Sequence, residues 1–295
     1  MGLLDTIIQN IPEIKGPTQK KLSFSEKAKW TLIILAIYFV LGNITLVGLS
    51  PQAEFQFAQV AVILGAVFGS IISLGIGPIV TSSIVLQLLN GSGIIHFDLT
   101  TQEGKKKFQG TQKILSVFFI IFEAAVFVFF GGFQPAITTP LWYFILILQL
   151  FIGGMIVLYM DEVIQKWGFG TGISLFIVAN VAQEIFVQAF SPFDGEGRFV
   201  FGLGGDISNV VRRVWYFIRF ITENNPEAWL AIASIVATVI VFAVSVYTQA
   251  MKVEIPLSFG RVRGYSIRWP LKFMYTSNIP VILVAALLAN IQLVV

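Results

Sequence analysis

The chain has 295 residues, of which 56% are apolar and 12% are charged, and its mean hydropathy is +0.83. A soluble domain carries about 25% charged residues, so this composition excludes an ordinary soluble protein and indicates one embedded in a membrane. The lack of cysteine excludes disulfides and thiol catalysis, and the single histidine, His96, excludes a histidine-based metal cluster built within the chain. We therefore expect no metal and no other cofactor.

Residues 1–29 are predicted to be an amphipathic N-terminal segment in the cytoplasm. Its apolar side chains recur at helical spacing, which predicts a short helix on the membrane surface; they are Leu3, Leu4, Ile7 and Ile8. The segment lacks the small-residue cleavage site of a signal peptide, and its residues 15–29 form a basic link to the first span.

Six segments are long and apolar enough to be ordinary membrane spans. A span needs about 20 apolar residues to cross roughly 30 Å of hydrocarbon. The candidates are residues 30–49, 114–133, 142–160, 173–190, 229–250 and 274–295. Three of them begin with tryptophan, which is typical of the lipid–water boundary: Trp30, Trp142 and Trp229. The composition and these spans predict an all-α, polytopic transmembrane helical bundle.

The apolar segment 57–89 is too long for one straight span and too short for two spans joined by a turn. Gly75-Ile76-Gly77-Pro78 interrupts it, and a proline suits the first turn of a new helix. We predict two half-helices, at residues 58–70 and 78–89, each about 18–20 Å long. Non-helical backbone survives at membrane depth where it is buried in protein or lines a cavity, so the break points to a pore or a binding site.

The charges predict an orientation. Most of the 19 basic residues fall in linkers on one side of the membrane if the broken segment crosses it once. The other side has four arginines in the long linker 191–228, namely Arg198, Arg212, Arg213 and Arg219. The positive-inside rule therefore predicts a cytoplasmic N-terminus and a multi-pass protein of the cell membrane.

Two isoleucine- and valine-containing pairs follow the glycine-rich breaks in the chain. Ile76 and Val80 share one helix face, as do Ile173 and Ile177, because residues four apart are neighbours on a helix. Such pairs usually face lipid or pack against other helices. They can also form a hydrophobic collar that excludes water and ions, and spacing alone does not decide between these readings.

Glu123 lies in the middle of the predicted span 114–133, where a carboxyl group is costly unless it faces a polar interior. It is either a hydrogen-bonded packing residue or part of a functional polar site. Its candidate partners in other segments are Thr81, Ser82, Gln87, Gln149, Asn180, Asn278 and Asn290.

The predicted cytoplasmic loop 251–271 carries three arginines, Arg261, Arg263 and Arg268. Their guanidinium groups suit phosphates. This pattern fits topogenic charge in contact with anionic lipid, and it fits equally well a surface that docks on RNA or on an acidic partner.

Several motifs occur in order along the chain. The first is the run ISLGIGPIVTSSIVLQLL at residues 72–89, and others follow at residues 108–110, 159–162, 170–176, 255–257 with 260–261, and 277–282. Together they resemble the SecY family, the pore subunits of the Sec protein-conducting channel, in its archaeal and eukaryotic branch. The resemblance covers essentially the whole chain, with gaps in the external linkers.

The resemblance implies roles for individual residues. The half-helix 58–70 matches the plug that closes the pore. The pore-ring positions match Ile76, Val80, Ile173, Ile177 and Ile282. A polar cluster of the lateral gate matches Thr81, Glu123 and Asn290, and the tip of a ribosome-docking loop matches Arg261 and Arg263.

The resemblance also implies an organisation and a set of partners. Residues 30–190 match a first half of five spans, and residues 229–295 match the first two spans of a second half, so the chain is expected to be truncated after the seventh span. The implied partners are a SecE/gamma-type subunit, a beta subunit, the ribosome or another cytoplasmic translocation partner, signal peptides, nascent polypeptides and membrane lipid.

The leading functional prediction is a protein-conducting channel subunit that translocates secretory polypeptides and releases membrane segments laterally. It is not expected to be an enzyme. The alternative is a secondary transporter that uses the broken helix as a solute site. A membrane protease is disfavoured because His96 lies in a linker, so no histidine base is available beside a serine within the membrane.

Overall fold

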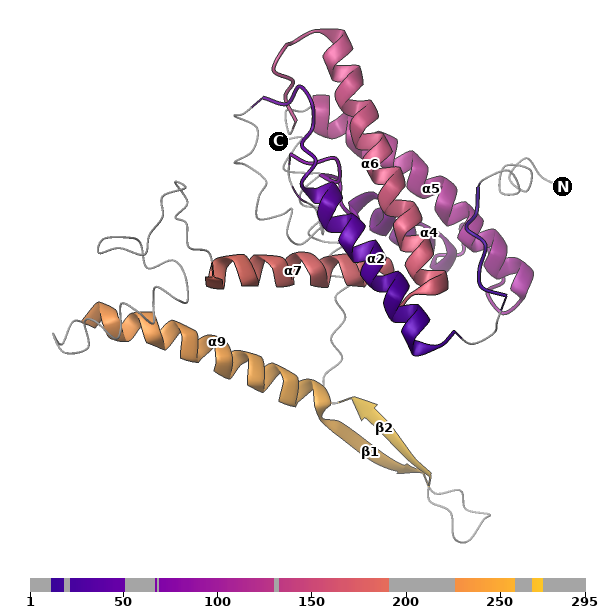
Figure 1. The fold of residues 1–295 in the computed structure, drawn as a ribbon. Helices are drawn as coiled ribbons and strands as arrows, with labels where there is room; N and C mark the ends of the chain where they lie inside the picture. The colour runs from indigo at the N-terminus through magenta and orange to yellow at the C-terminus, as the bar shows by residue number, and fades with distance from the viewer. Residues whose placement is uncertain are drawn as a thin grey trace. The chain divides into compact units, whose positions relative to one another are not determined.

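The computed structural model describes residues 12–18, 22–50, 67, 69–129, 133–190, 226–257 and 267–272. The described chain is mainly helical, as predicted, and contains six helices and two strands (Figure 1). It divides into two compact units, residues 1–183 with 279–295 and residues 184–278. Of the described elements, the first unit holds four whole helices and the start of a fifth, and the second unit holds the rest of that helix, the last helix and both strands.

Helix α2 spans Phe24–Gly42 and begins at a side-chain cap. The Ser23 hydroxyl accepts a hydrogen bond from the backbone N–H of Glu26 at 3.3 Å, which satisfies one of the free N–H groups of the first turn. The helix ends earlier than the predicted residue 49. Gly48 adopts a positive φ of 86°, which favours glycine, in the turn that follows.

Helix α4 spans Gly77–Gly91 and corresponds to the predicted second half-helix. Pro78 stands in its first turn, where the missing N–H of proline costs no helical hydrogen bond. The predicted first half-helix, residues 58–70, lies almost entirely outside the described residues.

Helix α5 spans Gln102–Phe129 and starts well before the predicted span 114–133. Its 28 residues reach about 42 Å at 1.5 Å per residue, so its lysine-rich first turns extend beyond a hydrocarbon layer of roughly 30 Å. The turn before it is ordered by Asp98, whose carboxylate accepts hydrogen bonds from the Thr100 hydroxyl and N–H. These bonds hold the pKa of Asp98 below its usual range.

Helix α6 spans Pro140–Trp167, and helix α7 spans Gly172–Phe190 after a short connection. A side chain of α6 caps the N-terminus of α7. Oδ1 of Asp161 in α6 accepts a hydrogen bond from the backbone N–H of Ile173 at 3.1 Å, and a carboxylate is favourable at a helix N-terminus. Gly172 lies so close to Asp161 that a Cβ there would clash with it.

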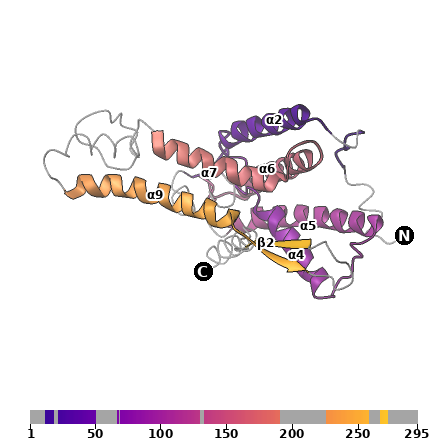
Figure 2. The same ribbon diagram turned by 90° about the horizontal axis from the view of Figure 1, so that it is seen from below.

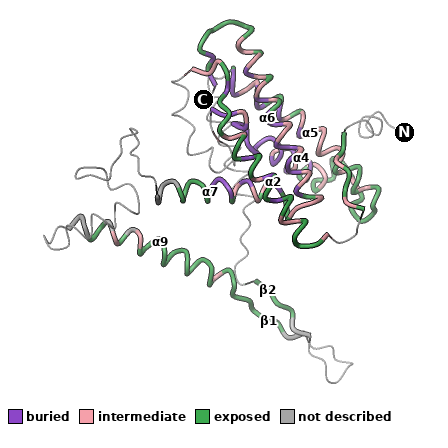
Figure 3. The backbone as a smooth tube through the Cα atoms, viewed as in Figure 1, coloured by how far each residue is buried: buried purple, intermediate pink, exposed green. Residues whose placement is uncertain are grey.

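In the first unit, α5 packs against both α4 and α6, and α6 also packs against α2 (Figures 1 and 2). Buried residues gather where these helices meet and in the segment that leads into α4 (Figure 3). The start of α7 joins this core. Phe176 stacks on the Tyr38 ring of α2 with centroids 4.7 Å apart, and the Tyr38 hydroxyl donates to Oδ1 of Asn180 at 2.9 Å.

In the second unit, α9 spans Pro226–Ala250, and strands β1 (Lys252–Leu257) and β2 (Ile267–Lys272) form an antiparallel hairpin. Lys252 pairs with Lys272 at its base, and Leu257 pairs with Ile267 at its far end. The hairpin occupies much of the predicted loop 251–271, so the chain is not helical throughout. Arg261 and Arg263 belong to the connection between the strands and lie outside the described residues.

Candidate functional site

The break before α4 is a run of turns at residues 70–76, and its backbone is hydrogen-bonded within itself. The N–H of Ser73 donates to the Ser70 carbonyl at 3.0 Å, and the N–H of Gly75 donates to the Ile72 carbonyl at 2.8 Å. Gly75 has a positive φ of 56°, which glycine adopts without steric cost. Residues 72–80 are all buried, so this non-helical backbone meets the condition for irregular chain inside a membrane.

The break is held by the extended chain that follows α2. The N–H of Ile71 donates to the Ile44 carbonyl, and the N–H of Leu46 donates to the Gly69 carbonyl, both at 2.8 Å. The side chain of Gln149 in α6 holds the same extended chain. Its Oε1 accepts from the Val47 N–H at 2.9 Å, and its Nε2 donates to the Val47 carbonyl at 3.1 Å.

The predicted hydrophobic pairs belong to, or pack against, the apolar core that contains part of the break. Ile76 is completely buried and Val80 is 6% exposed, and both belong to the apolar core of the first unit. Ile173 and Ile177 of α7 are partly buried and pack against the same core. Ile76 and Val80 are thus part of this core, and Ile173 and Ile177 pack against it. The fifth predicted ring residue, Ile282, lies outside the described residues.

The predicted polar cluster is present in part. The Thr81 hydroxyl donates to Oε1 of Glu123 at 3.3 Å, and Glu123 is 4% exposed. Ser82, the residue after Thr81, makes a second contact between α4 and α5: its hydroxyl and that of Ser116 form a buried hydrogen bond. Asn290 and Asn278 lie outside the described residues.

Three other candidate partners of Glu123 make hydrogen bonds elsewhere. Gln149 binds the backbone of Val47, Asn180 accepts from Tyr38, and Gln87 donates to the Ser83 hydroxyl. The position of these polar residues within predicted spans indicated that they face the interior. The sequence does not predict their hydrogen-bond partners, because Gln149 and Asn180 bond to residues more than a hundred positions away along the chain.

Three further residues of the site carry no role predictable from the sequence alone, namely Tyr38, Asp161 and Glu162. The signals were an aromatic hydroxyl inside a predicted span and two carboxylates at the end of one. Among the residues that the structure describes, no three histidine or carboxylate side chains converge on a possible metal position.

The fold and the site define a polytopic helical membrane protein in which buried, non-helical backbone precedes α4. α5 and α6 are each long and apolar enough to cross a membrane, and two shorter apolar helical stretches, Gly172–Phe186 and Ile235–Ala250, accompany them in the described chain. The interruption is buried at the centre of the first unit and is surrounded by aliphatic side chains.

The chain belongs to the SecY family. The family model described as SecY matches residues 70–295, and the model described as the plug domain of Sec61p matches residues 37–69. The second match includes most of the predicted plug half-helix.

Curated relatives and solved structures agree with this assignment. Protein translocase subunit SecY of Methanothermobacter thermautotrophicus is 45% identical over 96% of this chain, and that of Methanocaldococcus jannaschii is 44% identical over 99%. A solved protein-conducting channel aligns with a TM-score of 0.75 at 43% identity, over 98% of this chain and 62% of its own. Sec61 in the canine ribosome–channel complex aligns over the same shares with a TM-score of 0.74 at 43% identity.

The chain spans about three fifths of the length of the relatives that it matches. It covers 61% of the Methanothermobacter protein and 62% of the Methanocaldococcus protein.

Proposed function

We propose that this chain is the pore-forming part of a protein-conducting channel, which translocates secretory polypeptides and releases membrane segments sideways into lipid. The observation that carries the proposal is the buried break at residues 70–76, which ends with Ile76 completely buried at the start of α4. A channel for unfolded chains needs a seal that excludes ions without gripping peptide. Aliphatic side chains meet this need because they offer no hydrogen bonds.

The pore ring in this proposal consists of Ile76, Val80, Ile173, Ile177 and Ile282. Support comes from the burial of Ile76 and Val80 in the apolar core that contains part of the break, and from the packing of Ile173 and Ile177 against that core. The plug is the segment 58–70, which overlaps the match to the plug domain of Sec61p. Such a channel performs no chemistry of its own, and the driving force comes from a partner.

The lateral gate in this proposal contains the polar cluster of Thr81, Glu123 and Asn290. A buried carboxyl group in a span is costly and is retained where it has a polar partner. The hydrogen bond from Thr81 to Glu123 supports such a pairing between α4 and α5.

The lysine-rich end of the bundle, where α5 begins and α6 ends, faces the cytoplasm in this proposal, and so does the N-terminus. Support comes from the exposed Lys105, Lys106 and Lys107, because lysines next to a span favour the cytoplasmic side. The protein would reside in the plasma membrane of a prokaryote, in line with its archaeal relatives.

The proposed partners are a SecE/gamma-type subunit, a beta subunit and the ribosome. Sec61 of the canine ribosome–channel complex supports the ribosome as a partner. The connection between β1 and β2, which carries Arg261 and Arg263, is the proposed docking site.

The test is reconstitution of the full-length protein with its co-subunits in lipid vesicles. Ribosomes that translate a secretory precursor are added, and the fraction of precursor protected from external protease is measured. Protection that requires the channel supports the proposal. Vesicles that bind ribosomes but protect no precursor would contradict it.

A further inference from the structure

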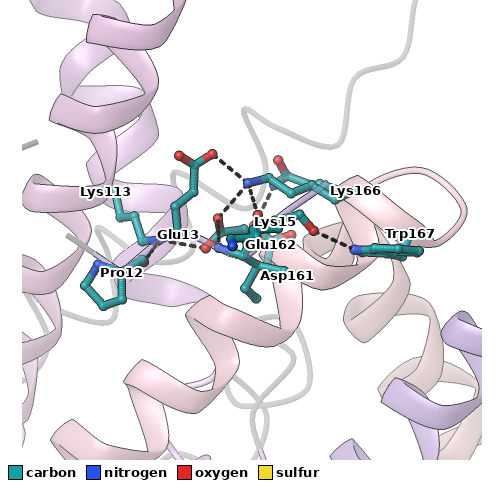
Figure 4. Close-up of polar contacts among 10 residues, drawn as sticks. Pro12, Glu13, Lys15, Lys113, Asp161, Glu162, Lys166 and Trp167 are labelled. Carbon is teal, nitrogen blue, oxygen red and sulfur yellow. Dashed lines mark hydrogen bonds and ion pairs between the residues drawn. The ribbon is translucent and has the colours of Figure 1, made fainter. Parts of the chain in front are cut away.

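Residues 12–15 of the N-terminal segment lie across the lysine-rich end of the bundle (Figure 4). The Glu162 carboxylate of α6 is the centre of the contacts. It accepts from Lys113 of α5 at 2.6 Å, from Lys166 at 3.0 Å and from the backbone N–H of Ile14 at 3.0 Å. One carboxylate thus contacts α5, α6 and the N-terminal segment.

Donors from the two helices also bind the backbone carbonyls of this segment. Lys113 donates to the Pro12 carbonyl at 2.7 Å, Lys166 donates to the Ile14 carbonyl, and the Trp167 indole N–H donates to the Lys15 carbonyl at 3.0 Å. Because these bonds go to main-chain atoms, they fix the path of the segment independently of most of its side chains.

Burial separates this network from ordinary surface charge. The side chains of Lys113 and Glu162 are each 15% exposed, so water and salt screen their ion pair weakly. Lys113 also lies over the Tyr159 ring, 5.1 Å from its centroid, which further restricts the ammonium group. The outer pair of Lys166 and Glu13 differs, since Glu13 is 72% exposed and exposed pairs contribute little.

We propose that residues 12–15 form a latch that fastens α5, at Lys113, to the last turns of α6, with Glu162 as its positioning residue. The latch goes beyond the proposed function and does not depend on it. Because α5 also carries Glu123, the partner of Thr81 in α4, a closed latch restrains α4 and α5 together against α6. Its release would free that pair at one end of the bundle.

Trypsin cleavage after Lys15 reports the state of the latch, since a protease needs this backbone free of Trp167. The full-length protein in lipid nanodiscs is treated briefly, and the Lys15–Gly16 cleavage rate is measured by mass spectrometry. Glu162→Gln should raise this rate about tenfold or more, because cleavage of a transiently opened segment follows the population of its open form. Higher salt should change this rate little in the parent protein, because the ion pair between Lys113 and Glu162 is screened weakly.

Glu103→Gln is the matched control. It makes the same chemical change at the same end of the bundle, but it removes an ion pair with Lys107 in which Glu103 is 80% exposed. This control should leave the cleavage rate unchanged. Trp167→Phe keeps every charge and should give a smaller increase, so it also serves as the second variant if Glu162→Gln does not fold.

The fastening of the helices has its own readout. The chain contains no cysteine, so cysteines placed at Lys106 of α5 and Gln165 of α6 accept spin labels without background. The distance distribution between the labels should broaden in Glu162→Gln and stay narrow in Glu103→Gln. Wild-type cleavage rates in folded Glu162→Gln and Trp167→Phe, or an equal increase in Glu103→Gln, would overturn the proposal.

Discussion

Gly153 of α6 lies directly against the carbonyl group of Ile71, in the turns that lead into α4. A Cβ built at Gly153 would overlap the Ile71 carbonyl oxygen, and one at Gly154 would lie 2.6 Å from Cγ2 of Ile120 in α5. The two glycines therefore give α6 a surface on which the break and α5 both approach the helix backbone. Small residues serve this purpose in membrane helices because they let backbones approach closely.

Replacement of Gly153 by alanine should destabilise the first unit by about 1–3 kcal/mol, since an added methyl group in a packed interior forces backbone shifts. The melting temperature in detergent, followed by tryptophan fluorescence, measures the effect. Gly91→Ala is the control, because a Cβ at Gly91 meets nothing within 4 Å. Equal melting temperatures for Gly153→Ala and the parent protein would show that the contact is not tight.

The break before α4 was predictable from the sequence because it depends on single residues. Proline in the first turn of a helix and glycine at a positive φ are properties of single residues, and both predict the start of α4. The end of α2 and the start of α5 were harder to place. The predicted spans were limited to apolar residues. Helix α5 begins earlier, because the lysines and glutamines that precede its apolar part favour helix about as strongly as leucine does.

The hairpin of β1 and β2 was missed for a related reason. Each strand contains a proline, Pro256 and Pro270, and proline within a run of residues argues against a strand. It is tolerated here because a two-stranded sheet consists of edge strands. In the candidate site, Thr81 was one of seven candidate partners of Glu123, and only the family resemblance singled it out, since hydrogen bonds between distant segments leave no pattern in one sequence.

Tyr38→Phe should test the contact between α2 and α7. It removes the hydrogen bond to Asn180 and keeps the ring stacked on Phe176. Hydrogen bonds between membrane helices contribute about 0.6 kcal/mol on average and up to ~1.7 kcal/mol, and the free energy of unfolding should fall by an amount in this range. Tyr38→Leu also removes the stacking and should cost about 1 kcal/mol more. Unfolding in a denaturing detergent gives both values, and equal stability of the two variants would contradict a contribution from stacking.

Ile177→Asn should make the closed channel leak ions if Ile177 belongs to the pore ring. A polar side chain in a hydrophobic constriction stabilises water there and so lowers the barrier to ions. The measurement is the resting conductance of the full-length protein with its co-subunits in planar bilayers. Val178→Asn is the matched control on the next residue, whose side chain is 64% exposed. An unchanged conductance in Ile177→Asn, or an equal rise in Val178→Asn, would remove Ile177 from the ring.

Reversal of two arginine charges between β1 and β2 should weaken ribosome binding. The double variant Arg261→Glu and Arg263→Glu replaces guanidinium groups that suit RNA phosphates with carboxylates that repel them. Co-sedimentation of the full-length protein with ribosomes, repeated over a range of salt concentrations, measures the loss and the change in salt dependence. Folding is checked by the melting temperature.

The control for this variant is a charge reversal at the base of the same hairpin. Lys252 and Lys272 pair in register and are both exposed, so Lys252→Glu with Lys272→Glu changes the net charge by the same amount. If docking depends on the connection between the strands, the arginine variant should lose far more ribosome binding than the lysine variant. Equal losses would assign the effect to the overall charge of the hairpin, and undiminished binding in the arginine variant would place the docking site elsewhere.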